Sequence, residues 1–411
     1  MRASSVRASR ILGFLAVAVL SAGCAATFDA SSPVGAAQAS NRFGFELYTK
    51  LKEGDKNLIY SPAGASIAMA MASAGARGRT QLEMTKVLHL EPTKLAESHA
   101  SFGSLLAALN AREGRGGVAL QVTDQLWGDE DVDFESDFLS LLATRYRAPL
   151  ERVNFVDASE NARDTINRWA AARTHDRIRE VIPRGGVDRN TRLVITNALY
   201  FKGTWLEQFS PEATSAQPFQ TATGPATVEM MAQRQMLRHA AVDGVSLVEL
   251  PYKGGLSMVV LLPDDASGLD AVENRLSSSY DDWLSALTFK RVDLWLPRWK
   301  FTSGLSLGSA LESLGMTTAF GEKADFSGIA ARRPADPPIA IDRVLQQAFV
   351  EVDEVGTEAA AVTAVAMAEL TSAREDEPER VVFRADHPFA YVIRDTGTGV
   401  VLFAGRVTDP R

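Results

Sequence analysis

The order of apolar and polar residues divides the chain into short helices and strands. Residues 41–52 and 95–109 place apolar side chains three and four positions apart, which predicts amphipathic helices. Residues 193–205 form an almost continuous apolar run, which is typical of a strand buried on both faces. Shorter apolar runs between residues 228 and 263 predict further strands. The chain therefore contains both helices and strands.

One stretch, residues 351–371, is compatible with two structures. Its sequence, EVDEVGTEAAAVTAVAMAELT, is rich in alanine, which favours a helix by local propensity. In an extended segment, however, residues two apart share a face, and alternate positions here are uncharged and either small or β-branched. These positions are Thr357, Ala359, Ala361, Thr363 and Val365. The stretch can therefore lie exposed, or it can be buried as a strand with Glu358 on the opposite face.

The composition is that of an ordinary globular protein. The chain has 411 residues, of which 46% are hydrophobic and 23% are charged, so it can bury a substantial core. No internal repeat or interdomain linker is visible, which predicts one domain at residues 41–411. The net charge of −8 argues against a nucleic-acid partner, because proteins that bind nucleic acid present clustered Lys and Arg. Cys24 is the only cysteine, so no intrachain disulfide is possible.

The first forty residues have the layout of an export signal. Three arginines precede an apolar run at residues 11–20, and small residues follow as far as Cys24. The apolar run is too short to span a membrane as a helix. A cysteine after small residues resembles the bacterial lipobox, although Ser21 stands where leucine is usual. We therefore predict a signal peptide at 1–23, lipidation of Cys24, and a flexible tether at 24–40.

Two strings near the C-terminus carry a family resemblance. The first is residues 355–361, VGTEAAA, and the second is residues 383–393, FRADHPFAYVI, closed by residues 402–407, LFAGRV. In this order they resemble the hinge of the reactive-centre loop and the C-terminal hallmark of the serpins. The resemblance implies the serpin fold, which is α+β, with mixed β-sheets, a large central sheet surrounded by helices, and an exposed reactive-centre loop at about residues 354–381.

The resemblance to serpins covers nearly all of the chain from residue 41 onward. Residues 193–205 closely resemble a central strand of the family. The resemblance places the region where the sheet opens at Ser61, Asn197, Trp205 and Gln346. The chain departs from the family in having Gln346 where histidine is frequent and Gly64 where serine is frequent. Because glutamine can still hydrogen-bond near Asn197, we expect control of sheet opening to be altered rather than lost.

The resemblance implies an inhibitor of serine proteases rather than an enzyme. In this family a protease attacks the loop as a substrate and is trapped as an acyl-enzyme when the cleaved segment inserts into the central sheet as a strand. The residues expected to form the hinge of that movement are Glu354, Gly356, Thr357, Glu358, Ala359, Ala360 and Ala361. The inward-facing hinge side chains are small enough for burial, and Gly356 supplies backbone freedom.

The family's spacing from Gly356 implies a reactive bond at Leu370–Thr371. A leucine before the bond indicates a target with an apolar primary pocket, that is, a chymotrypsin-, elastase- or subtilisin-like protease. The segment between the hinge and the C-terminal hallmark is long and acidic at its end, so the register stays open. Met367 and Arg374 are the alternatives, and Arg374 would indicate trypsin-like targets.

Two other functions stay open. A non-inhibitory serpin would act as a carrier or chaperone, although such members usually have bulky or charged hinge residues. A serine hydrolase is the other alternative, because residues 304–308, GLSLG, fit the nucleophile-elbow pattern around Ser306. Such an enzyme would need a downstream histidine, and His387 beside Asp386 is the candidate.

The expected partner is a target serine protease, joined covalently as an acyl complex to a monomeric inhibitor. No cofactor or metal site is expected, since the five histidines show no paired metal-ligand spacing. The N-terminal pattern predicts an exported protein. It would be a cell-envelope lipoprotein held to the membrane by its lipid, or an extracellular protein if secretion occurs without lipidation.

Overall fold

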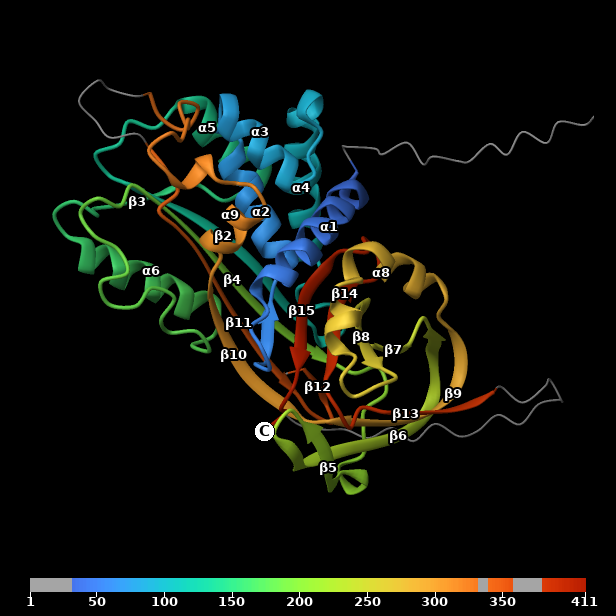
Figure 1. Cartoon of the computed structure of the whole chain (residues 1–411). Helices are drawn as coiled ribbons and strands as arrows, with labels where there is room; N and C mark the ends of the chain where they lie inside the picture. Colours follow the sequence, from blue (N-terminus) through green and yellow to red (C-terminus); the bar gives the residue numbers. More distant parts are fainter. Residues whose placement is uncertain (1–31, 332–338, 358–378) are drawn as a thin grey trace, which may run out of the picture.

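The computed structural model describes residues 32–331, 339–357 and 379–411. Cys24, the hinge residues 358–361 and the bond Leu370–Thr371 lie outside the described residues. Figure 1 shows helices gathered at one end of the molecule and strands forming most of the other end. The described chain thus combines helices with mixed β-sheets, which confirms the expected α+β fold.

Helices α1 to α5 and α9 pack together at one end, whereas α6 lies against the strands and α7 and α8 lie beside the second sheet (Figure 1). The α-helices are α1 Pro33–Leu51, α2 Pro62–Ser73, α3 Gly78–Val87, α4 Leu95–Asn110, α5 Ser136–Leu141, α6 Ser159–Arg173, α7 Leu269–Glu273, α8 Leu276–Ser285 and α9 Gly308–Ser313. A π-helical turn, Leu142–Tyr146, continues α5. Within the ranges given above, no helix is both long and apolar enough to cross a membrane.

The first sheet has six strands in the order β10-β11-β12-β4-β2-β3. They are β10 Trp299–Ser306, β11 Arg343–Val352, β12 Gly356–Thr357, β4 Leu193–Thr204, β2 Ala119–Asp129 and β3 Glu151–Val153. Strand β4 is buried at nearly every position, as its continuous apolar run predicts. It runs antiparallel to β2 and parallel to β11.

The second sheet has nine strands, with β5 pairing on β6 beside the main order β1-β15-β14-β8-β7-β6-β9-β13. They are β1 Leu58–Tyr60, β5 Ser215–Thr221, β6 Gly224–Val242, β7 Val245–Pro251, β8 Leu256–Pro263, β9 Thr288–Pro297, β13 Arg380–Arg384, β14 Phe389–Asp395 and β15 Val401–Val407. All of its pairings are antiparallel except that of β13 with β9.

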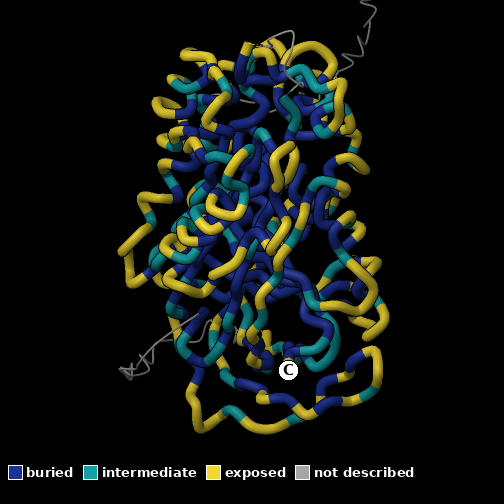
Figure 2. The backbone as a smooth tube through the Cα atoms, turned by 90° about the vertical axis from the view of Figure 1, so that its left-hand side faces the viewer, coloured by how far each residue is buried: buried dark blue, intermediate teal, exposed yellow. Residues whose placement is uncertain are grey.

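One large hydrophobic cluster joins the helical end to both sheets, and a smaller one lies beneath α6 around Trp127, Phe155 and Ile166. Figure 2 shows the buried segments running through the interior and the exposed segments around the outside. Because both sheets share the larger cluster, they form one folded unit.

Helix α1 begins at Pro33, eight residues before the helix predicted from the sequence. Ser32 caps it by accepting a hydrogen bond from Val34 N, and Pro33 occupies the first turn, where its missing N–H costs nothing. Small residues at 35–40 are mostly buried because they allow α1 to pack closely on α2 and α4. The prediction of a flexible tether at 24–40 and of a domain starting at 41 is therefore wrong from Pro33 onward.

Candidate functional site

The six-stranded sheet is only partly closed between β4 and β11, a boundary that we call the seam. Residues Arg343–Ala348 pair in parallel with Val194–Leu199. Beyond this point the two-residue strand β12 enters between them. Thr357 pairs with Val352 of β11 and with Gly203 of β4, antiparallel to both. One half of the seam is therefore closed, and the other already holds the first residues of the predicted hinge.

A side-chain network crosses the closed half of the seam. Gln346 lies opposite Asn197 in register, and its Nε2 donates to Asn197 Oδ1 at 2.7 Å and to the carbonyl oxygen of Ser61 at 3.1 Å. Gln346 Oε1 accepts from Ser61 N at 2.7 Å. The structure thus brings together Ser61, Asn197 and Gln346, so separating β4 from β11 requires the Gln346–Asn197 bond to break.

The network ends at Asp124 of β2, a buried carboxyl that lies opposite Asn197. Asn197 Nδ2 donates to Asp124 Oδ1 at 2.7 Å, while the buried Oδ2 has no hydrogen-bond partner among the described residues. Burial raises the pKa of Asp124 to about 8, although the bond from Asn197 acts in the opposite direction. Asp124 therefore keeps its proton near neutral pH, where an exposed aspartate is ionised.

Gly64, in the first turn of α2, leaves the space that the Asn197 amide occupies. A Cβ built on Gly64 would lie 2.2 Å from Asn197 Nδ2. The serine that is frequent in the family at this position therefore cannot fit here unless Asn197 moves. Glycine at 64 and the position of the Asn197 amide depend on each other.

Where the hinge enters the seam, the backbone of Gly356 lies very close to the backbone of Gly203 in β4. A Cβ built on Gly356 would lie 1.9 Å from the carbonyl oxygen of Gly203, so the pairing requires glycine. The next residue, Thr357, is only 1% exposed, and its hydroxyl shares a 2.7 Å hydrogen bond with the hydroxyl of Tyr252. The first inward position of the hinge is therefore buried in the intact chain.

A tight turn connects β11 to β12, and Trp205 holds it. Asp353 Oδ1 accepts from Val355 N at 2.9 Å and from Gly356 N at 3.1 Å. Trp205 donates its backbone N–H to the carbonyl of Val355 and its indole N–H to the carbonyl of Asp353, both at 2.9 Å. The Trp205 ring stacks on Tyr252 with 4.2 Å between centroids. The turn is therefore fastened to the end of β4.

Glu354, in the same turn, is 5% exposed and accepts hydrogen bonds from Arg298 Nε at 2.8 Å and from the Thr214 hydroxyl. Burial raises its pKa, but the hydrogen bonds from Arg298 and Thr214 outweigh burial and hold the pKa below its usual value. Glu354 therefore remains ionised and ties the turn to Arg298, between β9 and β10, and to the segment before β5.

Trp205 does not join the Ser61–Asn197–Gln346 network, although the resemblance grouped all four residues. It lies eight residues along β4 from Asn197, about 26 Å in an extended strand. The predicted sheet-opening group is therefore two separate sites, the network at the closed half of the seam and an anchor at the hinge.

Asp124 and Tyr252 were not among the site residues predicted from the sequence. A signal was present for Asp124, because Leu120, Val122 and Leu126 alternate with it at the buried positions of β2. A charge at an inward position marks a paired or functional carboxyl, since an isolated one is costly to bury. Tyr252 carries no comparable signal, because its partner Thr357 is 105 residues away along the chain.

The position of His387 does not support the hydrolase alternative at Ser306. Ser306 does lie between a strand and a helix, at the end of β10 before α9. His387, however, precedes β14 in the other sheet, and its ring nitrogens contact Asp386 Oδ1 at 3.0 Å and the carbonyl of Pro263 at 2.9 Å. Among the residues that the structure describes, no group of three or more His, Cys, Asp or Glu side chains is placed to hold a metal ion.

A sheet whose seam is closed along only one half, and a hinge strand that enters the other half from the end of β11, define the serpin class. The family model for serpins, described as serine protease inhibitors, matches residues 38–410. The chain therefore belongs to the serpin family. The match begins within α1, in agreement with the early start of that helix.

The most similar relatives include protease inhibitors. The chain is 37% identical to the human leukocyte elastase inhibitor over 386 residues, which cover 90% of this chain and 98% of that protein. Among solved structures, uncleaved ovalbumin superposes with a TM-score of 0.78 at 29% identity, covering 91% of this chain and all of that one. Human thyroxine-binding globulin complexed with its hormone gives 0.80 at 26% identity, with 92% and 99% covered.

Proposed function

We propose that this serpin inhibits serine proteases as a suicide substrate and has no catalytic activity of its own. The observation that carries the proposal is the position of Gly356 and Thr357, which already run as a strand antiparallel to both β4 and β11. If the residues after Thr357 continued in this register, they would extend β12 along the seam. The alternation of small uncharged residues from Thr357 to Val365 suits such burial.

The chemistry of trapping uses the protease's own serine. Its hydroxyl attacks a loop carbonyl, an ester forms, and the peptide bond breaks with its amine leaving on the C-terminal fragment. Insertion of the freed segment into the sheet, as known for serpins, then carries the esterified protease away from the loop's original position. The inhibitor needs only a cleavable bond and a seam that opens faster than water hydrolyses the ester.

Strand pairing can supply the free energy for insertion. The closed half of the seam, Arg343–Ala348 against Val194–Leu199, is parallel, and parallel pairing is slightly less stable per residue than antiparallel pairing. An inserted strand replaces this pairing with two antiparallel ladders. About fifteen new hydrogen bonds at roughly 0.5–1.5 kcal/mol each contribute on the order of 10 kcal/mol. That gain is set against the parallel pairing and the few side-chain bonds that break when the seam opens.

We further propose Leu370–Thr371 as the reactive bond, which makes proteases with an apolar primary pocket the targets. Mixing the purified protein with chymotrypsin, subtilisin, elastase and trypsin, followed by a denaturing gel, tests both statements. A trapped complex survives SDS, and mass spectrometry of the released peptide gives the bond. A non-inhibitory carrier would be cut without complex formation. An inhibitor should also unfold at a higher temperature after the loop is cut, and no such gain would contradict insertion.

We also propose that the chain is exported and held to a membrane through a lipid on Cys24. The support is the sequence pattern of residues 1–24 alone. Replacing Cys24 with serine should move the protein from the membrane fraction to the soluble fraction of expressing cells. Mass spectrometry of the N-terminal peptide would identify the acyl chains, and an unmodified thiol there would contradict lipidation and leave plain secretion.

A further inference from the structure

The described residues leave one face of the nine-stranded sheet uncovered near its β13 edge. Along β6, β9 and β13, alternate residues point inward and are buried, among them Leu237, Val292, Leu294 and Phe383. The residues between them point outward and form what we call the arginine face. Its members are Ala232, Arg234, Met236 and Arg238 of β6, Phe289, Arg291, Asp293 and Trp295 of β9, and Arg380, Val382 and Arg384 of β13.

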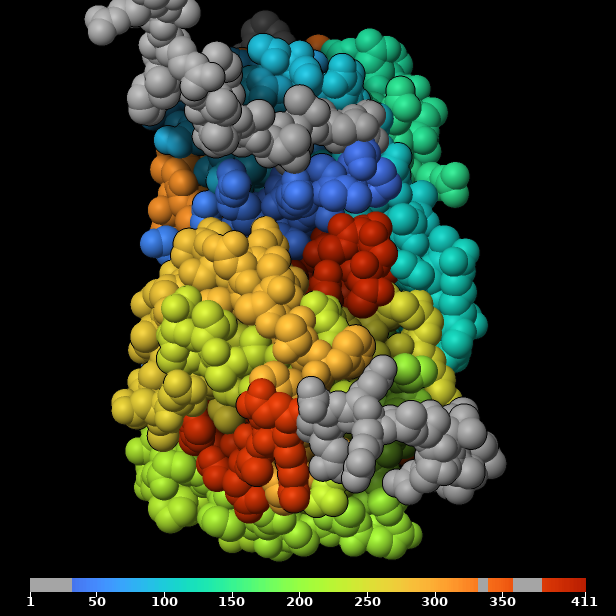
Figure 3. Space-filling view, turned by 90° about the vertical axis from the view of Figure 1, so that its right-hand side faces the viewer, coloured from blue at the N-terminus to red at the C-terminus, as the bar shows by residue number. Residues whose placement is uncertain are grey.

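Strand register arranges the arginine face in four rows, each of which mixes cationic and apolar side chains. The rows are Arg238 and Phe289; Met236, Arg291 and Arg380; Arg234, Asp293 and Val382; and Ala232, Trp295 and Arg384. Three apolar members are strongly exposed: Phe289 at 70%, Val382 at 65% and Met236 at 45%. Clustered exposed apolar side chains of this size mark contact surfaces more often than plain surface. Figure 3 shows β13 at the surface in the lower part of this view.

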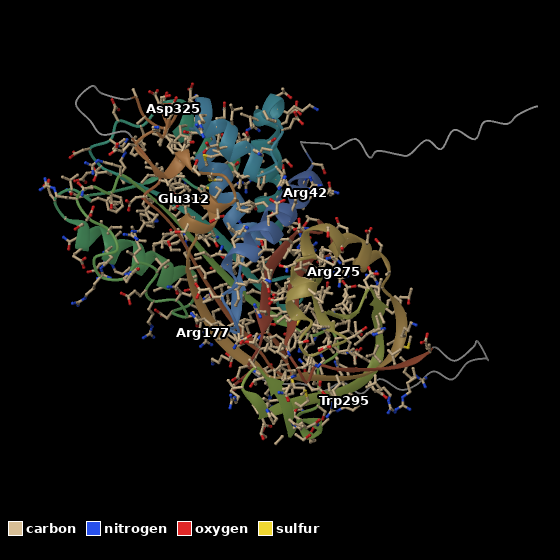
Figure 4. All side chains as sticks on the ribbon, in the orientation of Figure 1. Arg42, Arg177, Arg275, Trp295, Glu312 and Asp325 are labelled. Atoms are coloured by element: carbon tan, nitrogen blue, oxygen red, sulfur yellow. The ribbon has the colours of Figure 1, made fainter. Side chains whose placement is uncertain are left out.

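The charge of the arginine face is opposite to that of the whole chain. The face has five arginines and one aspartate, and two of the arginines pair with neighbouring carboxylates, Arg238 with Glu249 and Arg384 with Asp386. The face remains positive, whereas the chain has a net charge of −8. Asp293 is only 4% exposed because Arg234 and Arg380 cover it, with Arg380 Nε 2.7 Å from Oδ2. The guanidinium of Arg384 lies 5.1 Å from the centre of the Trp295 ring. Figure 4 places Trp295 among these strands, far from Asp325 at the helical end.

The position of the arginine face identifies the kind of partner. Strand β13 begins at Arg380, ten residues after Leu370 (380 − 370), which is at most about 35 Å of extended chain. A protease that engaged the proposed bond would therefore lie no farther than this length of chain from the start of β13. Arginine forks match carboxylates in paired hydrogen bonds, and arginine and aromatic side chains are enriched at protein interfaces.

We propose that the arginine face is a second docking surface for the target protease, and that it selects a protease whose rim beside the active-site cleft is acidic with some apolar side chains. This inference rests on the proposed inhibitory function. The face would increase the rate of encounter by electrostatic steering, and the loop would still determine which bond is cut.

A matched pair of proteases tests the proposal. Chymotrypsin and chymotrypsin with succinylated lysines differ in surface charge, since succinylation replaces each ammonium with a carboxylate. The double variant Phe289→Ala/Arg291→Glu should lower the association rate constant with the succinylated enzyme about 10-fold at low salt. Its rate with the unmodified enzyme should change less than about 2-fold. The control Leu82→Ala/Arg168→Glu makes equivalent changes at exposed positions of α3 and α6 and should leave both rates unchanged.

A second readout separates the docking surface from the trapping reaction. Anhydrochymotrypsin lacks the nucleophilic serine, so its succinylated form can bind but cannot be trapped. The Phe289→Ala/Arg291→Glu variant should bind this form more weakly than the wild type, even if no covalent complex ever forms and the proposed inhibitory function fails. Equal affinities and rates for the variant and the control would overturn the proposal. So would unchanged protease rates with lost binding to heparin or to phosphatidylglycerol vesicles, which would identify a polyanion or a membrane as the partner.

Discussion

The nine-stranded sheet is continuous from β1 to β13, whereas the six-stranded sheet has a seam between β4 and β11. In the first, Met230–His239 of β6 pair without interruption with Thr288–Pro297 of β9. In the second, β4 and β11 pair only from Arg343 to Ala348 before β12 comes between them. The nine-stranded sheet is therefore paired continuously, whereas the pairing of β4 with β11 in the six-stranded sheet is interrupted where β12 enters.

The two sheets also differ in what their central strands bury. The middle of the nine-stranded sheet is mostly apolar, with β8 and β14 buried along nearly their whole length. The seam instead holds Gln346, Asn197 and Asp124 side by side. Hydrogen bonds can be exchanged one at a time for new ones, whereas apolar packing is lost as a whole. We therefore expect sheet opening to depend on Gln346, Asn197 and Asp124, and each of these side chains can be tested by substitution.

The largest effect is expected from Thr357→Arg, which places a charge at the buried entry of the seam. Thr357 is 1% exposed, and an unpaired charge there costs several kcal/mol. Insertion should slow until hydrolysis of the acyl-enzyme wins, so the variant becomes a substrate. The yield of SDS-stable complex with chymotrypsin should fall from nearly complete to less than about a tenth, with the loop fully cleaved.

Thr357→Val is the matched control for this prediction. It keeps the shape of the side chain and removes only the hydrogen bond to Tyr252, which contributes about 1 kcal/mol. It should still form the complex in high yield. A Thr357→Arg variant that traps chymotrypsin as well as Thr357→Val does would show that the seam is not the route of insertion.

The next largest effect is expected from Asn197→Ala, which removes the centre of the network. Gln346 Nε2 loses one acceptor, and Asp124 loses the only partner that the described residues provide. Leaving two buried polar groups unsatisfied should cost about 4 kcal/mol of unfolding free energy. Amides of residues 194–199 and 343–348 should exchange hydrogen faster, whereas those of β8 and β14 should not.

Ser257→Ala supplies the comparison in the other sheet. Ser257 Oγ donates to buried Glu249 at 2.7 Å, so this variant also removes a buried hydrogen bond. It should lower overall stability modestly without speeding exchange at the seam. If both variants loosened the seam equally, sheet opening would depend on global stability rather than on the network.

Several parts of this arrangement could be predicted from the sequence because they are local. The alternation that begins at Thr357 and the apolar run of β4 both depend on neighbouring residues. The Asp124–Asn197 contact spans 73 residues and depends on strand register, which no local pattern reveals. The start of α1 was missed for a different reason, since a Ser/Ala/Gly-rich composition fits both a flexible tether and a closely packed helix.

A smaller effect, visible through its pH dependence, is expected from Asp124→Asn. The pKa of Asp124 is raised by burial to about 8 in the folded protein, against about 3.9 in an unfolded chain. Its contribution to stability is therefore fully present below pH 4 and is lost as pH rises towards 8. Between pH 6 and pH 8 the wild type should lose roughly 2 kcal/mol relative to the variant, because one proton is released on unfolding. Thermal melts at several pH values measure this, and parallel curves for the two proteins would contradict it.

The smallest effect is expected from Tyr252→Phe. This variant tests whether the hydrogen bond between Tyr252 and Thr357 holds the hinge in the seam. The variant keeps the ring that stacks on Trp205 and removes only the hydroxyl bonded to Thr357. The cost should be about 1 kcal/mol, too little to prevent trapping. Since the loop must move when a protease engages it, a weaker anchor should slightly raise the association rate constant with chymotrypsin while the yield of complex stays high.

Tyr391→Phe is a suitable control, because the Tyr391 hydroxyl is buried without a hydrogen-bond partner among the described residues. An unchanged rate in Tyr252→Phe would mean that the turn held by Trp205 and Glu354, rather than the Thr357 contact, limits release of the hinge.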